Sequence, residues 1–327
     1  MITVAERAKA WAQNRGRVLG LLQTYGLWLV IVLLLIAAAV ITPGYLSPIN
    51  LMMVLRQAAP LGIVAVGQLL VILVSGLDLS VGQLMSATCV VAGLYVVGEA
   101  GRIPMAVLLV VAIGIGVGLA NGIIITKRRV EPFIMTLAMM VILQGFHWNW
   151  SKGAKIGYVT EGFRQIALGY IGPVAMPVLI WAIVLIVAAV VLYRTPFGRQ
   201  VYATGGNREA ARLSGVNVDL VTVICYILCA LSAVLAGLIL LGYLAVGDSR
   251  VGIGYELGSI AAVVIGGASL AGGRGTIDGN IAGVLVLTLM GSLLNAFAVP
   301  WFGSQIARGV IIIAAVAWYV RGRGRGR

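Results

Sequence analysis

Long apolar runs recur along this chain of 327 residues, and they constrain its fold more than any other feature. The sequence is 61% hydrophobic and only 10% charged, and its mean hydropathy is +1.06. Soluble domains are about 45–50% apolar and about 25% charged, so a soluble fold of this size would leave much apolar surface in water. Lipid must cover part of the chain, and we expect an all-α polytopic membrane protein.

About ten apolar runs have the length of a membrane-spanning helix, which needs about 20 residues. The eighth run is short and is also consistent with a half-helix buried within the protein. The expected spans are 26–42, 51–74, 79–98, 104–126, 132–150, 174–193, 219–243, 257–271, 277–298 and 303–320. They leave an amphipathic segment at 1–25, a transmembrane domain at 26–320 and a basic tail at 321–327.

The basic residues are distributed unevenly between the two sides of the expected membrane domain. The net charge is +13, and the Lys and Arg residues lie in short stretches between the apolar runs. With the N-terminus in the cytoplasm, all but seven of the 23 fall on the cytoplasmic side, as the positive-inside rule requires. The exceptions are Arg56, Arg102, Lys152, Lys155, Arg164, Arg250 and Arg308. An even number of spans then places both termini in the cytoplasm, and the basic charge indicates topology rather than nucleic-acid binding.

The most informative polar stretch is the expected cytoplasmic loop at 194–218. After two glycines, Asn207 is a good helix N-cap, Glu209 suits the first turn, and Gly215 suits the end of the helix. A helix of about two turns is too short to be stable alone, so it must pack against the rest of the protein. Such a helix is suited to act as a lever for a soluble partner, although an ordinary capped connector between two spans is the commoner case.

Several blocks of this sequence are similar to one transporter family. Glu209-Ala210-Ala211, followed by Gly215, resembles the Glu-Ala-Ala…Gly coupling loop of ATP-binding-cassette importer permeases. The block 198–215 closely resembles the ribose, xylose and arabinose (monosaccharide) permeases. Further blocks extend the resemblance from about residue 45 to residue 310: Gly76–Gly82, Asn121-Gly122, Pro132–Leu137, Gly254–Leu257, Ile265–Leu270 and Gly272–Thr276.

The resemblance implies a vitamin-B12-permease-like (type II) importer fold in a bacterial inner membrane. It implies three protein partners: a second copy of this chain, an ATP-binding-cassette ATPase subunit and a periplasmic sugar-binding protein. The residues that would couple to the ATPase are Asn207, Arg208, Glu209, Ala210, Ala211, Arg212 and Gly215. No GxxxxGK[ST] motif occurs in the sequence, so we expect no cofactor on this chain, with ATP and Mg bound by the partner subunit.

Polar residues within or beside the spans are candidates for the translocation path or its gate. A neutral sugar needs hydroxyl-sized donors and acceptors and an aromatic face. The candidates are Asp78, Ser80, Asn121, Phe133, Thr136 and Asn295. Structural roles explain the same residues equally well: Asp78 is suited to cap the third span through amides near Ser80, and Pro132-Phe133 to start the fifth.

Charged residues on the expected outer side are candidates for docking the binding protein: Lys155, Arg164, Asp248, Arg250 and Glu256. Two of these positions have plain structural interpretations. The connection at 151–173 is equally consistent with a solvated loop, and Glu256 is suited to the N-terminus of the eighth helix.

Other functions remain as alternatives. An ion-coupled secondary transporter normally has paired charges inside its spans, which are scarce here. A permease of the same superfamily for nucleosides or branched-chain amino acids is a closer alternative. A membrane-embedded enzyme or a metal site is disfavoured by a single histidine, His147, and by cysteines that lie only in apolar runs: Cys89, Cys225 and Cys229.

Overall fold

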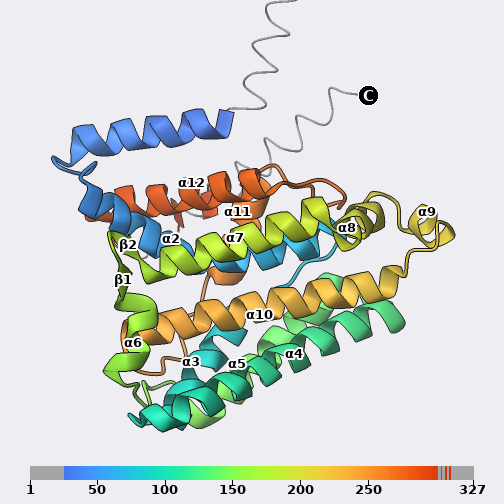
Figure 1. Ribbon diagram of the computed structural model, residues 1–327, viewed down its shortest axis with the longest axis horizontal. Coiled ribbons are helices and arrows are strands. Elements are labelled where there is room, and N and C mark those ends of the chain that lie inside the picture. The colour runs from blue at the N-terminus through green and yellow to red at the C-terminus, as the bar shows by residue number, and fades with distance from the viewer. Residues whose placement is uncertain (1–25, 301–302, 304–305, 308, 311–327) are drawn as a thin grey trace, which may run out of the picture.

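The computed structural model describes residues 26–300, 303, 306–307 and 309–310, and this part of the chain is mainly helical. A helix at Gly26–Ile41 precedes the elements labelled in Figure 1. The labelled helices are α2 (Pro48–Leu73), α3 (Val81–Val96), α4 (Ile103–Lys127), α5 (Pro132–Ser151), α6 (Glu161–Leu168), α7 (Met176–Arg194), α8 (Pro196–Gly206), α9 (Arg208–Leu213), α10 (Val218–Leu244), α11 (Tyr255–Ile265) and α12 (Ile277–Ala296). A 3-10 turn at Ala100–Arg102 leads into α4, and two short strands, β1 (Tyr170–Ile171) and β2 (Val174–Ala175), pair antiparallel between α6 and α7.

Helices lie at nine of the ten expected spans, and the tenth, 303–320, lies largely outside the described residues. Among the described helices, α2, α4, α7, α10 and α12 are long and apolar enough to cross a membrane. These helices fit a polytopic membrane protein. The total of ten spans stays a prediction, as do the amphipathic segment at 1–25 and the tail at 321–327, which also lie outside the described residues.

Two helices are shorter than their expected spans. The run at 257–271 forms a helix only in α11, whose 11 residues correspond to about 16 Å, or about half of a hydrocarbon layer of ~30 Å. The helix ends because Gly267 adopts a left-handed conformation with φ of +88°. The short length of α11 agrees with the half-helix interpretation of the eighth run. Helix α3 has 16 residues, since the chain before Val81 is not helical.

Helix α10 runs through the centre of the bundle, between α7 and α4 in Figure 1, and packs against α2, α3 and α4. Glycines on α4 allow a close approach. A Cβ atom at Gly118 would lie 2.6 Å from Ile227 Cα, and one at Gly122 would lie 2.7 Å from Val223 Cα. Larger side chains would force the two helices apart, so these small residues set the spacing of the core.

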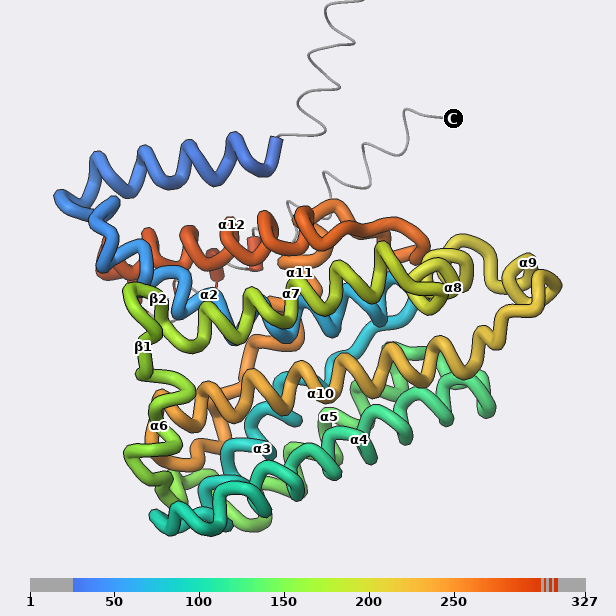
Figure 2. Tube along the Cα trace, in the orientation of Figure 1, coloured from blue at the N-terminus to red at the C-terminus, as the bar shows by residue number. Residues whose placement is uncertain are grey.

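The two ends of the bundle carry different elements, as Figure 2 shows. One end holds α6 and the β1–β2 pair, and the other holds α8 and α9, with α9 outermost among the described elements. The connection at 151–173, for which a solvated loop was one expectation, contains a packed helix. Helix α6 is capped by Thr160 and buries Phe163 and Ala167. The predicted loop at 194–218 contains two helices, since Thr195 and Pro196 start α8 as well.

Candidate functional site

The short helix predicted after Gly206 is present as α9, and both of its ends are formed as expected. The Asn207 side chain caps it by accepting a hydrogen bond from the Ala210 backbone nitrogen, at 3.0 Å. Gly215 follows the helix with a left-handed φ of +83°. Of its six residues only Ala211 is buried, so most of the helix surface faces solvent. A helix of this length depends on tertiary contacts for its stability.

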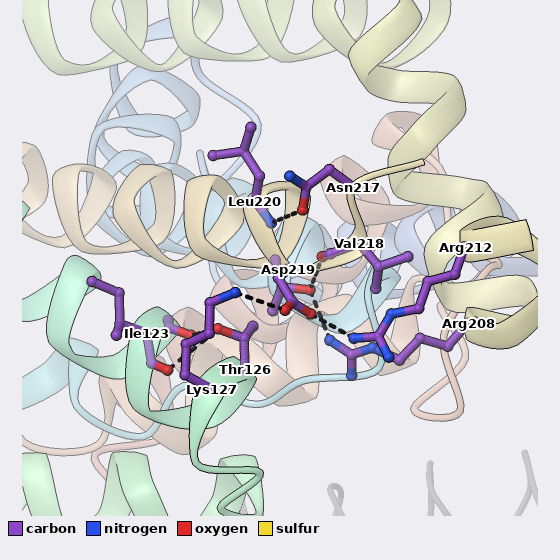
Figure 3. Close-up of polar contacts among 11 residues, drawn as sticks. Ile123, Thr126, Lys127, Arg208, Arg212, Asn217, Val218, Asp219 and Leu220 are labelled. Atoms are coloured by element: carbon purple, nitrogen blue, oxygen red, sulfur yellow. Dashed lines mark hydrogen bonds and ion pairs between the residues drawn. The ribbon is translucent and has the colours of Figure 1, made fainter. Parts of the chain in front are cut away.

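Charged side chains attach α9 to the start of α10, and the same region of α10 is attached to the end of α4. Asp219 accepts from Arg212 Nη2 at 2.6 Å and from Lys127 Nζ at 3.1 Å, using a different carboxylate oxygen for each. Arg208 Nη2 donates to Thr222 Oγ1 at 3.0 Å. Figure 3 shows Arg208 and Arg212 extending side by side from α9, while Lys127 approaches Asp219 from α4. These contacts link α9 to α10 directly and to α4 through Asp219.

The Arg212–Asp219 pair orients α9 more than it stabilises it, and the Lys127–Asp219 pair beside it is similarly exposed. The Lys127 side chain is 66% exposed and that of Arg212 is 46% exposed. Exposed pairs contribute about 0–1 kcal/mol each because water and salt screen them. Arg208 and Arg212 were predicted as site residues from the sequence, but Asp219 was not. Its position in the first turn of the long helix α10 is the only local signal that marks it, and acidic residues are common there.

Four of the six path candidates meet in one buried cluster where the chain passes from α2 to α3. Asp78, Asn121 and Thr136 are 0% exposed, and Ser80 is 1% exposed. Ser80 donates to Asp78 Oδ1 from its backbone nitrogen at 2.9 Å and from its hydroxyl at 2.6 Å. The Ser80 hydroxyl in turn accepts from Asn121 Nδ2 at 3.1 Å. The expected capping role of Asp78 is confirmed in part, since its bonds go to Ser80, which itself occupies the N-cap position of α3.

Side chains satisfy the polar backbone of this non-helical segment. The Leu77 carbonyl oxygen accepts from the Tyr226 and Thr136 hydroxyls, both at 3.2 Å. The Gln68 amide, turned so that its nitrogen faces the Asp78 carbonyl, makes a reciprocal pair with the Asp78 backbone at 3.1 Å in each direction. Buried backbone groups need such partners, so these side chains hold the interruption between α2 and α3 in place. Gln68 and Tyr226 were not among the predicted site residues.

The cluster keeps two acceptor atoms unused. Within the described residues, Asp78 Oδ2 and Asn121 Oδ1 are buried and have no hydrogen-bond partner. Buried polar atoms are normally paired, and unpaired ones are costly. One O–H donor to each oxygen would complete both groups, which suits a site that meets a polyhydroxylated solute or a water molecule.

Asn295 and Phe133 lie apart from this cluster. Asn295 lines a cavity of about 300 Å³ between α2, α11 and α12, together with Gln57, Tyr255, Thr288 and Ser292. Hydroxyl and amide groups from three helices in a cavity of this size suit a small polar molecule. Phe133 is 52% exposed on α5, whose first residue is Pro132, as predicted.

The docking candidates do not form one surface. Lys155 Nζ lies 4.0 Å from Asp248 Oδ2, and Arg164 pairs with Glu161 at 2.8 Å. Asp248 also accepts from the Arg250 backbone nitrogen at 2.9 Å. These residues lie in or near the end of the bundle that carries α6.

Glu256 is located apart from these residues and is half-buried, and its role in docking stays a prediction. The chain after α10 turns back along α3, where the Gly252 nitrogen donates to Ser86 Oγ at 3.0 Å. This brings Glu256 against Gly82 in the first turn of α3, where a Cβ atom would meet the Glu256 carboxylate. Both Glu256 carboxylate oxygens accept from the Gly254 nitrogen at 3.1 Å, which supports the structural interpretation.

Comparison with known proteins matches most of the chain. The family described as "Branched-chain amino acid transport system / permease component" matches residues 50–316. The chain is 40% identical over 315 residues to the ribose import permease protein RbsC of Escherichia coli (strain K12), with 94% of each chain covered. It is 34% identical to the galactose/methyl galactoside import permease protein MglC of Salmonella typhimurium (strain LT2), covering 94% of this chain and 96% of the relative. It is 32% identical to the L-arabinose ABC transporter permease protein AraH of Azospirillum brasilense, covering 95% and 91%. No solved structure matches.

Proposed function

We propose, from the premise that this chain belongs to the family of monosaccharide import permeases of ATP-binding-cassette transporters, that α9 couples it to a separate ATPase subunit. The protein is the membrane permease subunit of a sugar importer. One observation carries the coupling proposal. Helix α9 is capped, projects from one end of the bundle, and is tied by Arg208 and Arg212 to the central helix α10. Work done on α9 from outside is thereby passed into α10 and α4.

ATP hydrolysis then takes place on the partner subunit. The sequence contains no phosphate-binding GxxxxGK[ST] loop, so ATP and Mg belong to the ATPase that docks on α9. The coupling residues in this proposal are Asn207, Arg208, Glu209, Ala210, Ala211, Arg212 and Gly215. The end of the bundle that carries α9 then faces the cytoplasm of a bacterium, and the membrane is the inner membrane.

The solute proposed is a monosaccharide or a similar polyol. The relatives import ribose, galactose or L-arabinose by name. The cavity beside Asn295 offers amide and hydroxyl groups, and the cluster at Asp78 offers two unused acceptors. Neutral polar groups of this kind suit a sugar, whose hydroxyls both donate and accept. A second copy of the chain and a periplasmic sugar-binding protein complete the proposed importer, with Lys155, Arg164, Asp248 and Arg250 as docking candidates.

The coupling proposal is tested in the reconstituted importer by replacing Glu209 with Lys and, separately, Gly215 with Pro. Proline fixes φ near −65°, so it is incompatible with the left-handed φ of +83° at Gly215. Both variants should insert into the membrane normally and lose solute-stimulated ATP hydrolysis. Asp278→Lys reverses an exposed first-turn carboxylate on α12 and should keep the stimulation. Full stimulation in Glu209→Lys and Gly215→Pro would remove α9 from the coupling mechanism.

The description of the matching family supports a second candidate solute, a branched-chain amino acid. Isothermal titration of the cognate binding protein with pentoses, hexoses, nucleosides and branched-chain amino acids separates these classes. Binding of a sugar alone supports the first proposal, and binding of leucine or valine alone replaces it.

A further inference from the structure

We propose that a basic pocket beneath α9 binds a phosphate group, supplied either by an anionic lipid headgroup or by a soluble phosphate ester. The pocket has a volume of about 290 Å³ and is separate from the cavity beside Asn295. It is walled by α9, by the start of α10, by the α4–α5 connection and by the end of α2. Its lining includes Arg129, Arg208 and Arg212 as cations and Glu131 and Asp219 as anions.

The charges in the pocket are not balanced. Asp219 is already engaged, because Lys127 and Arg212 each bond one of its carboxylate oxygens. Within the part of the chain that the structure describes, neither Arg129 nor Arg208 forms an ion pair. Three arginines line the pocket against two carboxylates, Glu131 and Asp219, and Lys127 adds a further positive charge on Asp219, so the pocket keeps a net positive charge that an anion can neutralise. Guanidinium groups bind phosphate with paired, charge-assisted hydrogen bonds, so phosphate is the ligand that this arrangement fits best.

The position of Arg208 supports the same conclusion. Its guanidinium reaches Thr222, a residue that is only 2% exposed, and lies beside Arg212. Partial burial lowers the pKa of Arg208, the neighbouring charge of Arg212 lowers it further, and the charge of Asp219 acts in the opposite direction. A further anion placed between the arginines would offset their mutual repulsion.

The backbone of the pocket is also unusual. Six non-glycine residues among those described have a positive φ, and two of them, Ser75 at 63° and Arg129 at 55°, line this pocket. Such conformations are disfavoured for residues with side chains and concentrate at ligand sites. Arg129 lies in the short connection between the end of α4 at Lys127 and the start of α5 at Pro132, and its left-handed backbone turns the chain there.

The location makes a lipid headgroup and a soluble ester both chemically reasonable sources. The pocket lies where α4 ends and where α5 and α10 begin, which is the level of the headgroups if these helices span the membrane. Basic pockets between spans on the cytoplasmic side are typical binding sites for anionic headgroups. This inference goes beyond the proposed coupling function and does not require a bound ATPase.

The test uses the purified full chain and two double variants of equal charge. Arg129→Gln with Arg208→Gln removes two guanidinium groups of the pocket. Arg128→Gln with Arg199→Gln removes two exposed cations that do not line it. In neutral detergent at constant ionic strength, inorganic phosphate should raise the thermal unfolding midpoint of wild type and of the control variant in a saturable way. The pocket variant should need at least about tenfold more phosphate for the same shift, as expected from losing charge-assisted bonds.

The source is identified in nanodiscs of phosphatidylcholine with or without phosphatidylglycerol. If phosphatidylglycerol stabilises wild type and the control more than the pocket variant, and free phosphate then adds nothing, the ligand is a lipid headgroup. If phosphate acts equally in both kinds of nanodisc, the ligand is a soluble ester. Arg129→Lys with Arg208→Lys keeps the charge and the fold while losing paired bonding, and should fall between wild type and the Gln variant.

Equal effects of phosphate and phosphatidylglycerol on all variants overturn the inference. It is also overturned if neither anion acts and the pocket variant instead loses assembly with the ATPase, because the arginines then receive a carboxylate of that protein. Neither result bears on solute-stimulated hydrolysis in the Glu209→Lys test, so the two proposals fail separately.

Discussion

At the scale of single residues, the interior of this membrane protein is shaped by a few polar groups whose bonding is nearly, but not fully, satisfied. Asp78 accepts two hydrogen bonds from Ser80 on one oxygen, while its other oxygen has no partner among the described residues. A carboxylate within a membrane domain is normally paired or functional. The Asp78 side chain therefore combines a structural bond with an unused acceptor.

Replacing Asp78 distinguishes these two roles. Asp78→Ala should lower the free energy of unfolding by about 1–3 kcal/mol, because buried Ser80 donors lose their acceptor. Asp78→Asn keeps an acceptor oxygen and should cost clearly less. Denaturant unfolding in detergent measures both, with Asp278→Ala at an exposed position as the control. Equal losses for Ala and Asn would contradict the bonding argument, and normal assembly of Asp78→Asn with lost uptake would place Asp78 on the solute path.

Two adjacent glycines in α8 provide a matched pair for packing. A Cβ atom at Gly205 would meet the Leu73 carbonyl oxygen and would lie 2.5 Å from the Gly273 nitrogen. The Gly273 nitrogen donates a hydrogen bond to that same carbonyl oxygen at 2.9 Å, so the new atom would disturb this bond. At Gly206 nothing lies within 4 Å. Gly205→Ala should therefore destabilise the protein by about 1–3 kcal/mol, while Gly206→Ala should be nearly neutral. A thermal unfolding comparison that shows similar midpoints for the two variants would refute this contact.

At the scale of elements, the end of the bundle that carries α9 is built differently from its core. Helices α2 and α10 are stabilised by burial along most of their length. Helix α9 buries only Ala211 and is held by its cap and by polar contacts to α10, whose Asp219 also pairs with Lys127 of α4. An element with little apolar burial can be displaced at low cost, which suits a lever.

The contacts of α9 are tested by Asp219→Asn, which removes the charge that holds Arg212 and Lys127. Because these pairs are partly exposed, stability should fall by no more than about 1 kcal/mol. We expect a larger effect on coupling, measured as a several-fold loss of solute-stimulated ATP hydrolysis at unchanged assembly with the ATPase. Asp278→Asn makes the same charge change at an exposed site and should leave coupling unchanged. Unaltered stimulation in Asp219→Asn would show that this bridge transmits nothing.

At the scale of the whole molecule, the direction of the chain across the membrane decides which end meets which partner. Helix α9 lies at one end of the bundle and the C-terminal end of α12, at Ala296, lies at the other, and α12 is long enough to cross a membrane.

The native cysteines leave this arrangement open to a labelling test. All three are buried with 0% exposure, in agreement with their expected role as small apolar residues. An introduced thiol can therefore be followed with little background.

Two single-cysteine substitutions test this orientation in intact cells. Asn295→Cys, at an exposed position near the end of α12, should react with a membrane-impermeant maleimide from outside. Leu213→Cys, at a position that is 82% exposed on α9, should react only after the membrane is permeabilised. Wild type should remain unlabelled in both conditions. Labelling of both positions from the same side would invert or break the proposed topology.

The sequence by itself determined the features that depend on local chemistry. Apolar runs of spanning length predicted the positions of the helices, and the Asn207 and Gly215 signals predicted both ends of α9, because hydropathy and capping act over a few residues. The family resemblance rested on the same local blocks, and the comparisons confirm the family. The total of ten spans is still a prediction.

Only the tertiary structure decided how distant residues meet. It brought Asp78, Ser80, Asn121 and Thr136 into one cluster and placed Glu256 against Gly82. It also joined Lys127 to Asp219, which are 92 positions apart. No local pattern encodes such contacts, because they depend on how helices pack and on where the chain turns back within the membrane domain. Glycine spacing on α4 permits the close approach to α10, but the choice of partner is a property of the whole bundle.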